Sequence, residues 1–528
     1  MGPASGSPAT RPRLRVDLTG GDLHRMVDEA WQALLAANDE REPRVLVRGN
    51  EIVRMTERGE LEAYNVHSLR DELSRAADFG RPSKDGGWTS ALPTFDVAQA
   101  LLNRDSAEYA GAPRVERVVD IPVVAVDGSI ITEPGYHAGS RLFYRPAEDV
   151  GAIEVGDVEL VETVVEARDF LLNDLLGDFA FADEASKANA LALLLLPFVR
   201  DLIDGPTPMH VILAPEPGTG KTLLAETALL PGCGDVPVTP DADSDDQWRK
   251  GLTASLLSGA RALLFDNLKR ALDTGALAAA LTSGQWSDRV LGVSKQVTLP
   301  IRNVWVATGN NLELSDEQAR RAIPIFLDPG EQRPSDRPKS DFRHPDLLGW
   351  ARKNRTQLAS AALTLIRHWL DGDFVIVKAG TQFARTGADP CGSDRSLGSF
   401  ENWAQVIGGI LRAADVPGFL DNRDRLMDEA NVERQELAGF LEAWHALGRD
   451  PLLASELRQL CGYGGKLHDA LPQEIIAARN PERALGYWLR QHNNRRAGIY
   501  QLTRQGTRSP HRWYVRAPSA ASGADGQA

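Results

Sequence analysis

The segment from Met209 to Leu224, MHVILAPEPGTGKTLL, has the residue types of a loop that binds phosphate groups. An apolar run leads into a glycine-rich turn and then into a helix-forming stretch, which is the strand, loop and helix order that such a loop requires. Gly218 and Gly220 let the backbone turn so that its N–H groups converge on a β-phosphate. Lys221 reaches the β- and γ-phosphates, and the Thr222 hydroxyl can hold Mg²⁺. The expected cofactors are ATP and Mg²⁺, and the residues expected to contact the nucleotide are Pro217, Gly218, Thr219, Gly220, Lys221, Thr222 and Leu223.

One position departs from the usual pattern of this loop. The pattern GxxxxGK[ST] has glycine where this chain has Pro215. The alternative interpretation is an ordinary glycine-rich turn that carries a surface lysine. The GTGKT run directly after an apolar strand favours the phosphate-binding interpretation.

A nucleoside triphosphatase also needs an acidic side chain for the metal ion at the end of a second strand. The segment from Arg261 to Asn267, RALLFDN, places Asp266 after an apolar run, 45 positions after Lys221 (266 minus 221). We expect Asp266 to hold Mg²⁺, although on its own the pattern also fits a buried strand that ends in a turn. Asn267 stands where many ATPases of this kind have a glutamate base, and an amide can orient water but cannot take its proton. Either hydrolysis is slow, or Asp266 or Asp273 assists.

A third strand is expected from Asn303 to Asn311, NVWVATGNN, with a polar end. Because ligands bind at the carboxyl ends of parallel strands, we expect Asn310 to position the attacking water and to report the γ-phosphate. Arg320 and Arg321 stand directly before a fourth strand. Paired arginines are usually solvated, but this position suits an arginine finger that completes the ATP site of a neighbouring subunit. The catalytic residues expected from the sequence are Lys221, Asp266, Asn267, Asn310, Arg320 and Arg321.

The composition is that of a globular protein with several domains. The chain has 528 residues, of which 42% are apolar and 25% charged, so most of its length can bury a core. The net charge is −14, from 59 basic and 73 acidic side chains, which argues against a surface that is basic throughout. Three separated cysteines and no apolar run of about 20 residues argue against a disulfide framework and a membrane span. We expect a cytoplasmic protein that does not bind membranes.

Changes in composition along the chain predict an α/β protein with five parts. The expected parts are an N-terminal accessory α+β domain at 13–160, a P-loop motor with a parallel sheet flanked by helices at 161–345, a helical region at 346–450, a basic winged-helix-like domain at 451–516 and a disordered tail at 517–528. A proline-rich stretch at 329–345 reads as the loop that ends the motor.

Positive charge is concentrated between Arg483 and Arg516. This stretch has eight arginines, five interleaved aromatic residues and no acidic residue, and its local charge is +8. The pattern indicates a helix at 481–492 and strands at 499–503 and 512–515. Such a module is the electrostatic signature of nucleic-acid binding, and the alternative is that it pairs with the acidic residues between 151 and 184. The expected DNA contacts in this module are Arg490, Arg495, Arg496, Arg504, Arg508 and Arg512.

The region from about 165 to 345, about a third of the chain, resembles the AAA+ ATPase core and, more narrowly, the superfamily-3 helicases of viruses and plasmids. PEPGTGKT resembles Walker A, LLFDN resembles Walker B, ATGNN resembles the sensor-1 segment and QARRAIPIFLD resembles the arginine-finger element. The order of domains is similar to that of poxvirus-type primase-helicases and related proteins of phages, plasmids and integrated elements. The flanking regions match these proteins only weakly, in the order of their domains.

The resemblance implies a β-hairpin just before the sensor-1 strand that contacts DNA. The matching stretch is Asp288 to Pro300, DRVLGVSKQVTLP, in which apolar residues alternate around a turn. Arg289 and Lys295 would contact phosphate groups without reading bases. The alternative is an exposed hairpin whose lysine does not contact DNA.

The resemblance implies an ATP-dependent DNA helicase or translocase that acts as a ring-shaped oligomer, expected to be a hexamer, in the replication of a phage, plasmid or integrated element. Its partners would be single-stranded or forked DNA, further copies of itself and other replication proteins. The alternative is a DNA-binding AAA+ switch, such as an initiator, a loader or a defence ATPase, that does not unwind DNA. Asn267 in place of glutamate favours this alternative.

Overall fold

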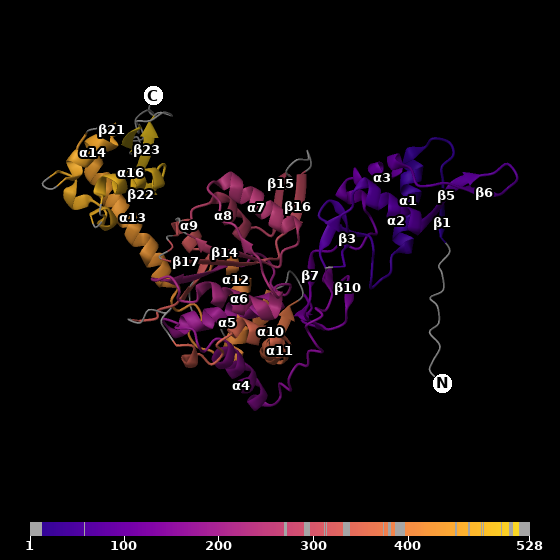
Figure 1. Ribbon diagram of the computed structural model, residues 1–528, viewed down its shortest axis with the longest axis horizontal. Coiled ribbons are helices and arrows are strands. Elements are labelled where there is room, and N and C mark those ends of the chain that lie inside the picture. Colours follow the sequence, from indigo (N-terminus) through magenta and orange to yellow (C-terminus); the bar gives the residue numbers. More distant parts are fainter. Residues whose placement is uncertain are drawn as a thin grey trace, which may run out of the picture. The chain divides into compact units, whose positions relative to one another are not determined.

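The computed structural model describes residues 13–57, 59–268, 272–289, 296–310, 312, 314–330, 338–372, 374–377, 382–385, 397–448, 451–462, 465–476, 478, 480–497, 499–505 and 511–516. Lys295, Arg508 and the tail expected at 517–528 lie outside the described residues. The chain divides into two compact units, one formed by residues 1–313 and 321–422 and the other by residues 314–320 and 423–528 (Figure 1). None of the described helices combines the length and apolar character that a membrane crossing requires.

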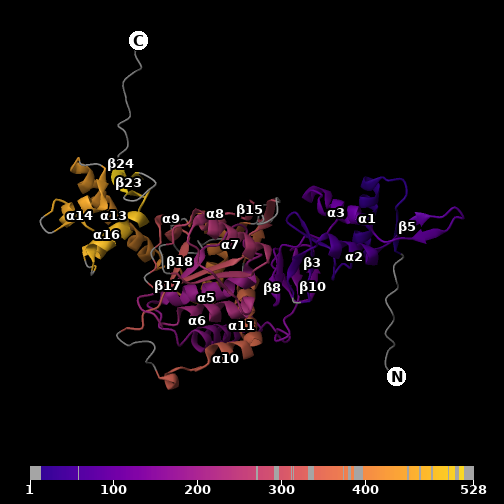
Figure 2. The ribbon, with the colours of Figure 1, turned by 45° about the horizontal axis from the view of Figure 1, so that its top comes forward.

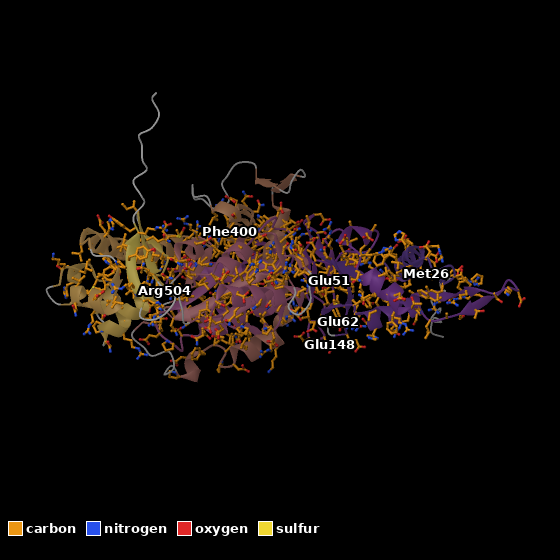
Figure 3. The ribbon with its side chains drawn as sticks, turned by 90° about the horizontal axis from the view of Figure 1, so that it is seen from above. Met26, Glu51, Glu62, Glu148, Phe400 and Arg504 are labelled. Atoms are coloured by element: carbon orange, nitrogen blue, oxygen red, sulfur yellow. The ribbon has the colours of Figure 1, made fainter. Side chains whose placement is uncertain are left out.

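The N-terminal part of the first unit has its own core. Its elements are α1 (Leu23–Ala37), α2 (Val66–Ala76), α3 (Phe95–Leu102), β1 (Leu14–Asp17), β2 (Leu46–Arg48), β3 (Glu51–Met55), β4 (Leu61–Ala63), β5 (Ala77–Pro82) and β6 (Trp88–Ser90). β1 pairs with β5 in parallel and β5 with β6 antiparallel, while β2, β3 and β4 form a second, antiparallel sheet. Asp22 caps α1, and Met26 (labelled in Figure 3), Trp31 and Leu34 form its buried face. The sequence predicts this mixture of helices and short strands for an α+β region.

Five short strands lead from this part toward the centre of the chain. They are β7 (Arg117–Val119), β8 (Val123–Val124), β9 (Ile130–Ile131), β10 (Gly135–His137) and β11 (Leu142–Tyr144). β11 pairs with β7 in parallel and with β10 antiparallel, and β8 and β9 form a hairpin.

The motif-bearing segments lie in a five-stranded parallel sheet. In spatial order its strands are β13 (Val238–Thr239), β14 (Ala262–Leu268), β17 (Val304–Asn310), β12 (Met209–Ala214) and β18 (Ala322–Phe326). All four pairings are parallel, so the carboxyl ends of the strands lie at one edge. β17 lies between β12 and β14, although it follows both in the sequence. The expected mixed α/β fold with a parallel sheet is confirmed.

Helices cover both faces of this sheet. α5 (Glu184–Val199) and α6 (Lys221–Cys233) lie on one face, and α7 (Asp245–Leu257) and α8 (Gly275–Thr282) lie on the other (Figure 2). Trp248 of α7 packs on Phe265 of β14, with their ring centroids 4.8 Å apart. α5 is apolar on all sides because it is buried between the sheet and the helices α11 (Arg355–Asp371) and α12 (Glu401–Ala413).

The remaining elements of the first unit surround the sheet. They are α4 (Val161–Asp169) with a π-helical turn at Phe170–Leu175, the strands β15 (Gln285–Arg289) and β16 (Gln296–Pro300), α10 (Leu347–Lys353), and the strands β19 (Phe374–Val377) and β20 (Gln382–Arg385). β15 and β16 pair antiparallel and form the hairpin expected before the third strand. Val297 and Leu299 of β16 are buried, as its alternating pattern predicts.

The second unit packs around a separate core. Its elements are α9 (Asp316–Ala319), α13 (Arg423–Ala446), β21 (Leu452–Leu453), α14 (Ala454–Cys461), α15 (Gln473–Ile476), α16 (Pro481–Gln491), β22 (Arg496–Ala497), β23 (Tyr500–Gln505) and β24 (Arg512–Arg516). The strands form an antiparallel sheet in the order β21-β24-β23-β22. The expected helix and two strands of the basic module are present, with ends within two residues of the prediction. The helices of the region expected at 346–450 are shared between the units, because α10 to α12 belong to the first and α13 to the second.

A largely buried carboxylate, that of Asp120, joins the segment after β7 to the sheet and its helices. Asp120 forms an ion pair with Arg261, directly before β14, and accepts a hydrogen bond from Arg355, at the start of α11, at 2.9 Å. Arg355 is 3% exposed and also donates to the carbonyl of Leu230 in α6, at 3.1 Å. Burial opposes ionisation of Asp120, but the two guanidinium groups outweigh it and hold the pKa of its carboxyl below the ordinary value. Two further ion pairs join the same stretch to the core, Arg117–Asp201 and Glu116–Arg302.

The substitution Asp120→Asn is expected to lower the free energy of unfolding by about 3 kcal/mol, because it leaves two largely buried guanidinium groups without their counter-ion. Urea unfolding followed by circular dichroism measures this change. Asp149→Asn is the matched control, since Asp149 contacts Arg355 at 3.5 Å but is 59% exposed, and we expect at most about 1 kcal/mol from it. Equal effects of the two substitutions would contradict the special role of Asp120.

A histidine without polar partners lies in the middle of the sheet. His210 of β12 is fully buried and packs edge-on against Trp403 of α12, with ring centroids 5.9 Å apart. Neither of its ring nitrogens has a hydrogen-bond partner in the described part of the chain. Burial lowers the pKa of His210 to about 3, so the ring is neutral in the folded protein at neutral pH.

Stability is therefore expected to fall as the pH drops below about 6.5, because the unfolded chain then binds a proton at His210 that the folded chain does not. This one group contributes a loss of about 2 kcal/mol between pH 7 and pH 5. The slope of unfolding free energy against pH, compared between wild type and His210→Leu, measures the contribution. The same slope in both proteins would show that the buried ring does not govern this pH range.

Candidate nucleotide site

The loop between β12 and α6 has the backbone conformation that its glycines predict. Gly218 and Gly220 have φ angles of +79° and +87°, in the left-handed region that residues with a side chain rarely adopt. α6 begins directly after Gly220, so its unpaired N–H groups and the positive end of its dipole face the loop. A Cβ atom at position 220 would lie 3.5 Å from the Phe179 ring. The backbone conformation therefore favours glycine at the start of the helix, although the space there would admit a Cβ atom.

The ammonium group of Lys221 lies inside the curve of this loop. It donates hydrogen bonds to the carbonyl oxygen of Glu216 and to the hydroxyl of Thr219, both at 3.1 Å, and to Oδ1 of Asn310. The lysine is only 7% exposed, and its burial lowers the pKa of Lys221, while the charge of Asp266 opposes that shift. A cation held in this way is placed to bind an anion that enters the loop.

The carboxylate of Asp266, near the end of β14, meets α6 and β17. Its Oδ1 accepts a hydrogen bond from the Thr222 hydroxyl at 2.7 Å and another from the Thr308 hydroxyl at 2.6 Å. Mg²⁺ prefers oxygen ligands and is usually bound by one or two protein groups together with substrate phosphates. One carboxylate and one hydroxyl at the mouth of this glycine-rich loop fit that preference. The described residues contain no group of three or more His, Cys, Asp or Glu side chains that could hold a metal without phosphates.

Thr308 holds the end of its strand next to the Asp266 carboxylate. It is fully buried in β17, donates to Asp266 and accepts the backbone N–H of Asn267 at 2.8 Å. Asn267 has φ +53°, where the strand register shifts between Phe265 and Leu268. Asparagine tolerates this left-handed conformation better than most residues. The sequence predicts a polar end for this strand but does not reveal the bridging role of Thr308.

The strand order brings four predicted residues together. Ala214, the last residue of β12, pairs with Asn310 of β17, and the Asn310 side chain meets Lys221. Thr222 and Asp266 are in direct contact. Lys221, Thr222, Asp266 and Asn310 thus lie at the carboxyl ends of three adjacent strands. Asn267 follows immediately, with its side chain exposed to solvent.

The two predicted arginine-finger residues belong to different units. Arg320 is exposed, and its carbonyl oxygen accepts a hydrogen bond from Arg423 of α13 at 3.2 Å. Arg321 is partly buried before β18, and its carbonyl oxygen accepts the N–H of Met209 of β12 at 2.9 Å. Their action on a neighbouring subunit stays a prediction.

The predicted DNA contacts have different surroundings. Arg289, Arg490 and Arg504 (Arg504 is labelled in Figure 3) are exposed. Arg512 is exposed but donates to the carbonyl oxygen of Pro451 at 3.0 Å and lies 3.7 Å from the Glu456 carboxylate. Arg495 directly precedes β22, and Arg496 is its first residue. Lys295 and Arg508 lie outside the described residues.

Two residues near the loop were not singled out from the sequence. Phe179 lies in a segment that runs beside β18, where the N–H of Ala182 donates to the carbonyl of Phe326 at 2.9 Å. Glu226 lies one turn after Thr222 on α6, and its burial raises the pKa of its carboxyl, with the charge of Asp266 acting in the same direction. The Phe179 contact depends on a sheet edge about 150 residues away in sequence, which no local pattern reveals.

Comparison with known proteins gives limited similarity. No protein-family model matches the chain, and no curated protein matches it. Among solved structures, the apo form of the NrS-1 C-terminal region is similar with a TM-score of 0.32 and 12% identity, over 63% of this chain and 68% of that one. JCV helicase with a bound small molecule is similar with a TM-score of 0.21 and 17% identity, over 39% of this chain and 61% of that one. Functional conclusions therefore depend on the geometry of the site.

The substitution Thr308→Val removes the hydroxyl that bridges Asp266 and Asn267 while keeping the shape of the side chain. We expect nucleotide turnover to fall about 10- to 100-fold and the Mg²⁺ concentration for half-maximal turnover to rise, because the groups behind a metal ligand set its orientation. Steady-state turnover over a range of Mg²⁺ concentrations measures both effects.

Thr227→Val is the matched control. Thr227 is equally buried, on α6, and its hydroxyl has no hydrogen-bond partner within the described residues. This variant should behave like the wild type. A fall in turnover at an unchanged Mg²⁺ requirement in Thr308→Val would indicate general loosening of the sheet instead.

Proposed function

We propose that this chain is an ATP-dependent DNA helicase or translocase that acts as a ring-shaped oligomer in the replication of a phage, plasmid or integrated element. One observation supports the proposal above all. Lys221, Thr222, Asp266 and Asn310, from three segments of the chain, converge at the carboxyl edge of a parallel sheet. This is the set of groups that a Mg²⁺-dependent nucleoside triphosphatase requires.

The arrangement suggests how ATP would be held. The loop N–H groups and the start of α6 would bind the β-phosphate, and Lys221 would exchange its carbonyl and amide partners for phosphate oxygens. Thr222 and Asp266 would hold Mg²⁺, which would neutralise charge that develops on the phosphates. Asn310 would then be released from Lys221 and would be free to orient water at the γ-phosphate.

Residue 267 limits how that water can be activated. The Asn267 side chain can orient water but cannot accept its proton at neutral pH. Its backbone is held by Thr308, and its side chain is exposed. Asp266 or Asp273 would then have to assist, so we expect slow hydrolysis that a DNA-bound or assembled state accelerates.

Ring assembly would supply the remaining parts. Arg320 or Arg321 of one copy would stabilise charge on the phosphates bound by the next copy. The β15–β16 hairpin, with Arg289 and Lys295, would contact the phosphates of a DNA strand in the channel. Hydrolysis would move this hairpin along the strand, and the basic module after residue 451 would add further DNA contacts.

A second candidate is a DNA-binding AAA+ switch that uses ATP to control assembly and does not unwind DNA. The exposed Asn267 in place of a glutamate base is the observation that favours it. In that case ATP would hold the oligomer together, and turnover would stay low with or without DNA.

We expect wild-type protein to hydrolyse ATP, to be stimulated by single-stranded DNA and to displace a strand from a forked duplex. Lys221→Ala should reduce turnover by about 100-fold or more, because a preorganised cation at the phosphates is lost. Lys187→Ala is the matched control, since Lys187 lies on α5 with its ammonium 3.5 Å from Asn173 and should leave turnover unchanged.

Phosphate release with and without oligo(dT), and strand displacement on the same preparation, measure these outcomes. Turnover that DNA does not stimulate, together with ATP-dependent oligomers that leave the fork intact, would reject the helicase in favour of the switch. Wild-type turnover in Lys221→Ala would reject both.

A further inference from the structure

The sheet of the second unit has one face that its helices leave uncovered. Leu502, Trp513 and Val515 are buried on the inner face, which packs against α13. Successive residues of a strand point to opposite faces, and residues directly opposite one another on antiparallel strands share a face. The outer sheet face therefore carries Gln501, Thr503 and Gln505 of β23 opposite Arg516, Tyr514 and Arg512 of β24.

Solvent exposure agrees with this assignment. Arg512, Arg516 and Gln505 are exposed, while Tyr514, Thr503 and Gln501 are partly exposed. β24 is an inner strand of the sheet, because it pairs with β21 on one side and β23 on the other. Its three outward side chains thus form a row, arginine, tyrosine, arginine, across the middle of the face.

The outer sheet face is cationic and has no acidic member. Ordinary solvated surfaces mix both signs of charge. Here the only acidic contact described is Glu456 of α14, which lies 3.7 Å from Arg512 at one end of the row. Arg516, at the other end, has no acidic partner among the described residues. Four residues along a strand separate the two arginines by about 13 Å, so they can contact different phosphate groups.

We propose that the outer sheet face binds single-stranded DNA, with phosphates on Arg512 and Arg516 and a base stacked on Tyr514. An aromatic ring between cationic side chains on an open sheet is a typical platform for unpaired bases. The grooves of a duplex admit a helix or a two-stranded ribbon, and the broad face of a four-stranded sheet does not fit them. The inference rests on the proposed function only in taking DNA as the polymer.

Two exposed cations elsewhere in the same unit provide the comparison. Lys466 and Arg483 are exposed and are not among the DNA contacts predicted from the sequence. Loss of equal charge from these two positions and from the outer sheet face separates a specific platform from general attraction.

The test is fluorescence anisotropy of the full-length protein with labelled dT₂₀ and, separately, a 20-base-pair duplex, without nucleotide. We expect Arg512→Gln/Arg516→Gln to weaken dT₂₀ binding at least tenfold. The slope of log K against log salt should fall in magnitude by about 1.4, since single strands release about 0.7 counter-ion per phosphate contact. Lys466→Gln/Arg483→Gln removes the same charge and should stay within about threefold of the wild type on dT₂₀.

The stacking contact is tested at Tyr514. Tyr514→Val keeps a strand-forming residue but removes the ring, and we expect a loss of about fivefold to a hundredfold on dT₂₀. Tyr514→Phe keeps the ring and should bind like the wild type. Circular dichroism of each variant verifies that the unit is folded.

Equal losses in the two double variants, no loss in the sheet variants, or a loss confined to the duplex would each overturn the proposal. DNA-free ATP turnover of the same variants keeps the two claims apart. If the wild type fails to hydrolyse ATP, the proposed function fails while the binding comparison still decides the role of the outer sheet face.

Discussion

The candidate site depends on one carboxylate oxygen. Oδ1 of Asp266 accepts hydrogen bonds from the hydroxyls of Thr222 and Thr308, so α6, β14 and β17 meet at a single atom. This is possible only because β17 lies between β12 and β14. A parallel sheet with this order collects polar side chains from three segments at one edge, while its apolar strands stay buried. At the same edge of the sheet, the hydrogen bond from Lys221 to Asn310 joins the start of α6 to the end of β17.

The parts of the site with local physical causes could be predicted from the sequence. Gly218 and Gly220 are needed for positive φ, Lys221 begins the helix that follows, and Asp266 ends an apolar run. The role of Thr308 could not be predicted, because it depends on which strands become neighbours. The left-handed backbone of Asn267 has a similar cause, since it accompanies the register shift between β14 and β17. Phe179 reaches the loop only through the pairing of its segment with β18.

The fold also has features with local causes, which the sequence predicts, and features that depend on distant segments, which it does not. The amphipathic pattern of α1, the all-round apolar α5 and the alternating strands of the basic module predict their own structures. Packing between distant segments was not predictable. α11 and α12 share the core of the sheet, whereas α13, which follows them, packs with β23 and β24. Helical periodicity identifies a buried face but does not say which partner buries it.

The shared carboxylate of Asp120 has an evolutionary consequence. Arg261 and Arg355, 94 residues apart, are both matched to an acid that precedes them by more than 140 residues (355 minus 261, and 261 minus 120). Recombination that exchanged the N-terminal part for that of a distant relative would leave two basic groups in the core without their acid. The N-terminal part and the sheet are therefore expected to be inherited together. Domain shuffling across this junction would require compensating changes at three separate positions, 120, 261 and 355.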